Sequence, residues 1–356
     1  MSIQAKEENT IPNNKDNQND NKQWHDAQGR VFSYLGFITL MFTAISLIVG
    51  SLAELVFPYI SKSLPPLLSH AMVTTFIPLY VVTVPFIYWK LRRKETRPLE
   101  KKHLSASFYI QVVIVSFGTV YVGNYLSLGL ASLLARFGLP SVNPLEALLG
   151  SINMWEAAFY TVIAAPIAEE LIFRKGMMSL LLPYGEKTAI FVSALFFALV
   201  HGNLYQLIYA FGLGCVLGYL YVKSGRLRDV IAVHALVNFT GGVFPLVLMK
   251  QIDDQFLDRM ETFSQMMEQA PKESLELLMD NILPLLGLLF LSFLTIFSIV
   301  GAVIILLRNR KKIQLERGET PLKKGHRFKT IFSNPGVMIS ILFYFVLIAV
   351  RIIWKF

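Results

Sequence analysis

Three segments in the middle of the chain place ionisable side chains inside long apolar stretches. The first contains Glu169, Glu170 and Arg174, the second ends at His201, and the third contains His234. A charge at the centre of a bilayer costs about 3 kcal/mol even on the most lenient insertion scale. Such side chains must therefore face the interior of a helix bundle or a water-filled cavity, where carboxylates and imidazoles can carry out acid–base chemistry.

Helical spacing gives the two glutamates different partners. Glu170 and Arg174 are four residues apart, so they share one helix face in the favourable order, with the acid before the base. Glu169 is turned by about 100° from that face. We therefore expect Glu170 and Arg174 to form a structural ion pair, which leaves Glu169 free to act as a general base.

The hairpin between the first two segments predicts that Glu169 meets His201. Its turn lies near Tyr184 and Gly185, with Glu169 about fifteen residues before the turn and His201 about sixteen after it. At about 1.5 Å per residue, their depths match within roughly one helical turn.

The third segment offers two hydrogen-bond donors on one helix face. His234 and Asn238 are four residues apart, so their N–H groups can converge on one point, as an oxyanion hole requires. His234 follows Arg228 by only six residues, however. Short or tilted helices, or a thinner bilayer, are needed to bring it level with Glu169.

The elements that must position these residues are membrane helices. The chain has 356 residues, of which 54% are hydrophobic and only 16% are charged, whereas about 25% are charged in an ordinary soluble domain. Apolar runs of about 20 residues, the length that crosses a bilayer, recur along it. We predict an all-α, polytopic transmembrane helix bundle of eight or nine spans. These lie near residues 32–57, 72–89, 107–134, 155–182, 187–200, 204–222, 230–249, 282–307 and 337–354.

The remaining sequence predicts one membrane domain with a polar tail. Residues 1–30 lack the apolar core of a signal peptide, so we expect a disordered cytoplasmic tail, followed by a helical membrane domain over 31–356 with a catalytic core at 155–244. Seven basic residues in 90–102 and nine in 308–329 flank predicted spans. This positive-inside pattern predicts a multi-pass protein of the cell membrane with a cytoplasmic amino terminus, and it explains the net charge of +9 without a nucleic-acid partner.

The three segments together resemble the CAAX-protease and bacteriocin-processing family, also called the Abi family, and within it the bacterial branch. The family pattern is EExxxR, FxxxH and HxxxN on successive membrane helices. All three motifs are complete here, at Glu169, Glu170 and Arg174, at Phe197 and His201, and at His234 and Asn238. Each motif alone is weak, but the three in this order are specific.

The resemblance implies an intramembrane glutamic endopeptidase acting on a membrane protein or peptide in the lipid bilayer. It implies that Glu169 and His201 activate a water, that His234 and Asn238 stabilise the oxyanion, and that Glu170 and Arg174 support them. No cofactor is expected.

Three alternatives stay open. The two histidines and one glutamate are also compatible with a zinc-dependent version of the peptidase, although the compact HExxH signature is missing. A non-catalytic membrane scaffold or bacteriocin immunity protein could use the same cavity to bind a peptide. A proton-coupled transporter also uses buried acids and histidines, but the sequence has no visible inverted repeat.

Overall fold

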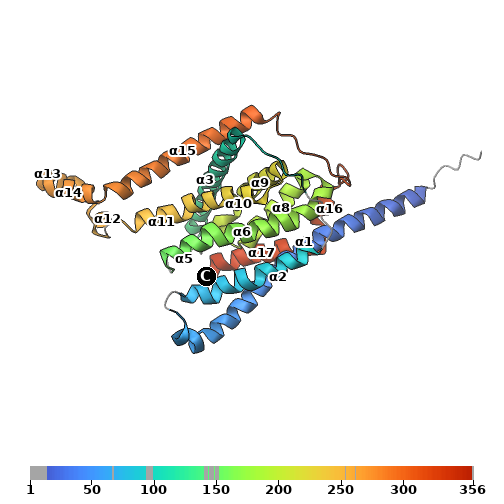
Figure 1. Ribbon diagram of the computed structural model, residues 1–356, viewed down its shortest axis with the longest axis horizontal. Helices are drawn as coiled ribbons and strands as arrows, with labels where there is room; N and C mark the ends of the chain where they lie inside the picture. The colour runs from blue at the N-terminus through green and yellow to red at the C-terminus, as the bar shows by residue number, and fades with distance from the viewer. Residues whose placement is uncertain are drawn as a thin grey trace, which may run out of the picture.

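The computed structural model describes residues 14–65, 68–93, 99–139, 143, 148, 152–252, 254–260 and 262–354. Every regular element among them is a helix. Most of the long helices run side by side, and α3 lies between α9 and α15 and packs against both (Figure 1).

The α-helices have the following bounds: α1 Asn14–Ile60, α2 Val84–Arg92, α3 Ala106–Arg136, α5 Met154–Ala158, α6 Ala165–Glu170, α7 Ser179–Leu181, α8 Glu186–Val200, α9 Leu204–Ser224, α10 Leu227–Asn238, α11 Phe244–Met249, α12 Asp254–Met260, α13 Phe263–Gln269, α14 Pro271–Asp280, α15 Ile282–Asn309, α16 Arg327–Phe332 and α17 Pro335–Trp354.

The predicted all-α membrane bundle is confirmed, and the protein is a multi-pass membrane protein. Seven helices of the described chain are long and apolar enough to cross a bilayer: Gln28–Ser63, Met72–Arg92, Ala106–Arg136, Leu204–Ser224, Leu227–Met249, Ile282–Asn309 and Pro335–Ile353. Two further predicted spans, 155–182 and 187–200, are helical as well. The first is rich in charge and the second belongs to α8, which has only 15 residues. The first contains Glu169, and the second ends directly before His201.

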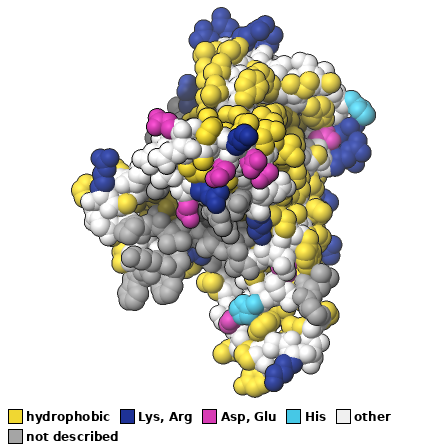
Figure 2. Space-filling model, turned by 90° about the vertical axis from the view of Figure 1, so that its left-hand side faces the viewer, with side chains coloured by type: hydrophobic (Ala, Val, Ile, Leu, Met, Phe, Trp, Pro, Cys, Tyr) yellow, Lys and Arg dark blue, Asp and Glu magenta, His cyan; other side chains and the backbone are white. Residues whose placement is uncertain are grey.

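The apolar surface agrees with a membrane environment. Helix α15 leaves Leu283, Leu289, Phe293 and Ile296 largely exposed. Hydrophobic side chains also spread over much of the face seen in Figure 2. Large apolar side chains exposed along a helix of this length are typical of contact with lipid.

The polar amino-terminal segment is helical from Asn14 onward, where we expected disorder up to residue 30. Helix α1 continues from the apolar part of the bundle outward through this polar stretch (Figure 1). Once a helix is nucleated, each added residue gains one hydrogen bond, so the apolar part of α1 can extend into this stretch. Residues 1–13 lie outside the described part of the chain.

Several membrane helices contain π-helical segments, which the sequence analysis did not predict. These are η2 Met72–Phe76, η3 Pro78–Thr83, η4 Phe159–Ala164, η5 Leu171–Met178 and η7 Phe239–Val243. A proline follows the end of four of them by two residues, at Pro78, Pro85, Pro166 and Pro245. Proline lacks the N–H of an α-helical bond and its ring clashes with the carbonyl four residues earlier, so a wider turn before it relieves both problems.

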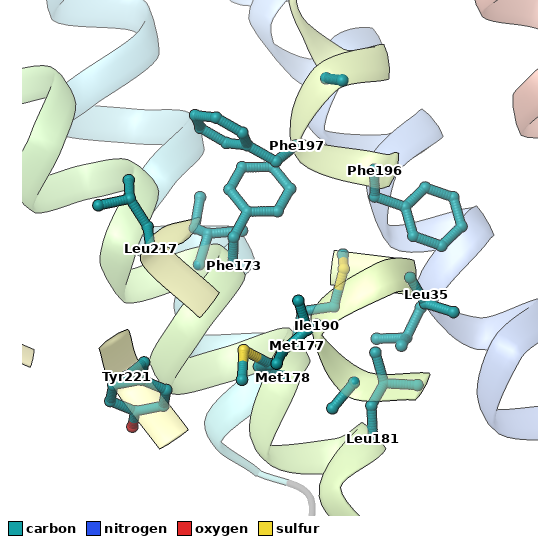
Figure 3. Close-up of a cluster of buried hydrophobic side chains, with 14 of the residues drawn as sticks. Leu35, Phe173, Met177, Met178, Leu181, Ile190, Phe196, Phe197, Leu217 and Tyr221 are labelled. Carbon is teal, nitrogen blue, oxygen red and sulfur yellow. The ribbon is translucent and has the colours of Figure 1, made fainter. Parts of the chain in front are cut away.

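Helix α8 lies at the centre of the buried core. Its Phe196 and Phe197 are at most 1% exposed and point in opposite directions, Phe196 toward Leu35 and Phe197 toward Phe173 (Figure 3). Helix α9 approaches α8 closely at Gly214, where an added Cβ would lie 3.0 Å from the Cα of Ala194. A larger residue at Gly214 would push the two helices apart.

The turn that begins α8 is held by the loop before α16. The backbone N–H of Glu316 donates to Oε2 of Glu186 at 3.0 Å, and Lys223 Nζ approaches the same oxygen at 3.1 Å. The backbone N–H of Thr320 donates to the carbonyl of Pro183 at 2.9 Å. These bonds fix the hairpin whose two arms carry Glu169 and His201.

Candidate active site

The predicted ion pair between Glu170 and Arg174 is present and fully buried. Arg174 Nε lies 3.0 Å from Glu170 Oε2, and both side chains are 0% exposed. The contact lacks hydrogen-bond geometry, so the attraction there is electrostatic. Arg174 Nη1 donates to Ser193 Oγ at 3.3 Å, and this hydroxyl donates to the carbonyl of Phe173 at 2.8 Å. These two bonds of Ser193 connect the π-helical segment η5 to α8.

His234 lies between the two glutamates. Its Nδ1 is 2.8 Å from Glu170 Oε1, and its Nε2 is 3.6 Å from Glu169 Oε2. An ionised carboxylate only accepts hydrogen bonds, so Nδ1 carries the proton in its bond to Glu170. The imidazole reaches both acids because α10 packs directly against α6 and η4. His234 therefore lies at the depth of the two glutamates. This depth was difficult to explain from the sequence, because His234 follows Arg228 by only six residues.

Glu169 is the acid of the site that remains accessible. Its side chain is 26% exposed, whereas that of Glu170 is 0% exposed. Within the described chain, Glu169 is paired with His234 rather than with His201, the partner that the hairpin spacing predicts. The phenol groups of Tyr80 in η3 and Tyr209 in α9 lie within electrostatic reach of Glu169. No motif pointed to these two tyrosines, because they lie on other helices.

His201 directly follows α8 and has a defined ring orientation. Its Nδ1 is 2.7 Å from the carbonyl oxygen of Phe197, one turn earlier. A carbonyl only accepts, so Nδ1 carries the proton and Nε2 of the neutral ring has a free lone pair. The His201 side chain can therefore accept a proton or a hydrogen bond at Nε2.

Phe197 connects the two histidines. Its ring centroid lies 5.1 Å from that of His201 and 5.8 Å from that of His234, both edge to face. The guanidinium of Arg174 lies 5.0 Å from the same ring centre. Such contacts fix ring orientation and contribute roughly 1 kcal/mol each beyond burial.

Asn238 shares a helix face with His234 as predicted, but its amide already has an acceptor. Nδ2 donates to the backbone carbonyl of Thr161 at 2.8 Å. The Nδ1 proton of His234 is likewise given to Glu170. An oxyanion role therefore requires the second amide N–H of Asn238 and a proton on Nε2 of His234.

The described residues contain no group of three His, Cys, Asp or Glu side chains spaced to hold a metal ion.

Comparison with known proteins gives one family match. Residues 151–240 match the model of the Rce1-like family, described as Type II CAAX prenyl endopeptidase Rce1-like. No curated protein and no solved structure matches the chain. The matched segment contains all six predicted site residues, Glu169, Glu170, Arg174, His201, His234 and Asn238. The match over residues 151–240 agrees with the resemblance of the three motifs to the CAAX-protease family.

Proposed function

We propose that this protein is an intramembrane endopeptidase that hydrolyses a peptide bond of a membrane-associated protein or peptide, with Glu169 as the general base. One observation carries this proposal. An accessible carboxylate, Glu169, lies beside a buried imidazole, His234, whose other nitrogen is held by the enclosed pair of Glu170 and Arg174. A base at the edge of a preorganised polar cluster is what general-base hydrolysis requires.

In the proposed reaction, Glu169 takes a proton from a water molecule, and the resulting hydroxide attacks the scissile carbonyl carbon. The lone pair on Nε2 of His201 accepts a hydrogen bond from the same water and orients it. Asn238 and His234 donate to the developing oxyanion. Glu169 then returns its proton to the leaving amine as the C–N bond breaks, so no covalent enzyme intermediate forms.

The charges of the cluster support a doubly protonated His234. Glu169 and Glu170 are acids, and Arg174 supplies one positive charge among them. A neutral ring leaves one net negative charge in a buried site, whereas an imidazolium balances it and places a donor on Nε2, 3.6 Å from Glu169. The same proton serves the oxyanion.

The family name points to substrates with a carboxyl-terminal CAAX sequence whose cysteine carries a prenyl group. The resemblance to the bacterial branch favours an unmodified membrane peptide. We further propose that the protein resides in the cell membrane with its amino terminus in the cytoplasm, on the basis of its basic loops.

Comparison of the membrane proteome of cells that contain the wild type with that of cells that contain Glu169→Gln tests this function and finds the substrate. We expect one peptide or membrane protein to accumulate uncleaved in the variant. Identical proteomes and an unchanged phenotype would instead favour a binding role, such as a scaffold or an immunity protein.

Metal analysis of the active, purified protein decides between this mechanism and the zinc-dependent version. We expect activity without stoichiometric metal. Zinc at one ion per chain, lost together with activity on chelation, contradicts the proposed role of Glu169 as a base without metal.

A further inference from the structure

Arg351 connects α17 to His201 and Gly202, the two residues that directly follow α8. Its Nη1 donates to the carbonyl oxygen of Gly202 at 2.9 Å and approaches that of His201 at 3.4 Å. Arg351 lies in α17, outside the segment that matches the family model. An arginine at a predicted membrane-helix end has no evident partner in the sequence, so this contact with the site was not foreseen.

Side-chain donors and a backbone bond, from the N–H of Gly202 to the carbonyl of Leu199 at 2.9 Å, hold the turn at residues 201–203. The carbonyl of His201 also accepts from Asn203 Nδ2 at 3.2 Å. Gly202 adopts a left-handed conformation with φ of +59°, and a Cβ there would lie 2.8 Å from Leu347 Cδ2. Helix α17 thus packs directly on the backbone of the turn, at a point where only glycine fits.

Helix α17 is itself fixed in register against α1. Gly336, Ser340 and Tyr344 follow one another at intervals of four residues on the face that meets α1, and Arg351 lies on the same face. The bonds of this ladder are Gly336 N to Ser33 Oγ at 3.0 Å, Ser340 Oγ to Gly36 O at 2.7 Å, and Tyr344 Oη to Thr39 O at 2.8 Å. An arginine on a helix held in this way is itself fixed in position.

We propose that Arg351 is a positioning residue for His201, a role that rests on the proposed function. The carboxyl end of α8 carries partial negative charge, because its last carbonyls have no partner inside the helix. The Arg351 cation lies at this end and donates to the carbonyls of the next two residues, His201 and Gly202. The backbone at residues 201–202 then stays in place. This keeps Nδ1 of His201 on the Phe197 carbonyl and directs the lone pair of Nε2 to one point.

Kinetic comparison of three variants tests this role on a substrate that the wild type cleaves. Arg351→Gln removes the cation, Arg351→Lys keeps it, and Arg136→Gln removes an exposed arginine from the end of α3, which packs in the same apolar cluster as α17. We expect Arg351→Gln to lower kcat by about 10- to 100-fold with little change in KM, as a small misplacement of a reacting group does. Arg351→Lys restores most of the rate, and Arg136→Gln matches the wild type.

Nitrogen NMR of ¹⁵N-histidine-labelled protein tests the contact without any activity. In the wild type and in Arg351→Lys, His201 should show one neutral tautomer with the proton on Nδ1. In Arg351→Gln we expect a mixture of tautomers. An unchanged tautomer together with an unchanged kcat in Arg351→Gln overturns the role of Arg351.

The two readouts separate this inference from the proposed function. If Glu169→Gln cleaves at the wild-type rate, the proposed mechanism is wrong, and the NMR result alone then decides whether Arg351 orients His201. If Glu169→Gln is inactive while Arg351→Gln keeps full activity and an unchanged His201 tautomer, the mechanism stands and the positioning role is refuted.

Discussion

Removal of the Arg174 charge should destabilise the protein more than any surface substitution. Arg174→Met leaves Glu170, which is 0% exposed, without its cation and removes the hydrogen bond from Arg174 to Ser193. Breaking a buried ion pair from one side costs about 3–5 kcal/mol, because the remaining charge stays in a low-dielectric interior. We expect a loss of this size in the free energy of unfolding.

A double variant separates the charge from the packing. Glu170→Leu combined with Arg174→Met removes both charges and fills the space with apolar atoms. Replacing a buried ion pair by apolar side chains is often neutral or stabilising, so we expect stability within about 2 kcal/mol of the wild type. Cleavage should not recover, because His234 loses the acceptor of its Nδ1 proton.

Reversible unfolding in mixed micelles of a mild detergent and dodecyl sulfate, followed by tryptophan fluorescence, measures both effects. Ser292→Ala, which removes an exposed hydroxyl bonded only to its own helix, serves as the control and should stay within about 0.5 kcal/mol of the wild type. A loss below about 1 kcal/mol for Arg174→Met, or a double variant as unstable as the single one, refutes the reasoning.

Two matched pairs of variants test the packing around the site. Phe197→Leu and Phe196→Leu should each lower the free energy of unfolding by about 1–2 kcal/mol, since both rings are buried. Only Phe197→Leu should also lower kcat, by about tenfold or more. Equal effects on kcat would show that Phe197 does not orient the histidines. Gly123→Ala places a Cβ 2.6 Å from the Cα of Tyr209 and should destabilise by about 1–3 kcal/mol, whereas Gly129→Ala meets nothing within 4 Å and should leave stability unchanged or raise it. Thermal unfolding in detergent compares the two glycine variants, and equal shifts would contradict the close approach of α3 to α9.

The sequence predicted what depends on local geometry. The four-residue spacing of Glu170 and Arg174 fixes their contact within one helix, and the structure shows it at 3.0 Å. The apolar runs likewise predicted membrane helices, because length and hydrophobicity decide this locally. The π-helical segments were missed, although the prolines that follow four of the five are a signal that could have indicated them.

Contacts between distant helices could not be read from spacing. Glu169 and His234 are 65 residues apart, and the contact of Arg351 with the His201 carbonyl spans 150 residues. Such pairs depend on which helices pack together and at what tilt. Hairpin arithmetic placed His201 at the depth of Glu169, but it could not tell which of two imidazoles would turn toward the acid.

Single-turnover cleavage by purified Glu169→Gln tests the central claim most directly. The substitution keeps the shape of the side chain and removes the base, so we predict that the rate constant falls by about 100-fold or more. The free energy of unfolding should change little, because the side chain is 26% exposed. Glu54→Gln, which alters an exposed acid of α1, should cleave at the wild-type rate. Cleavage by Glu169→Gln at the wild-type rate contradicts the assignment of Glu169 as the general base.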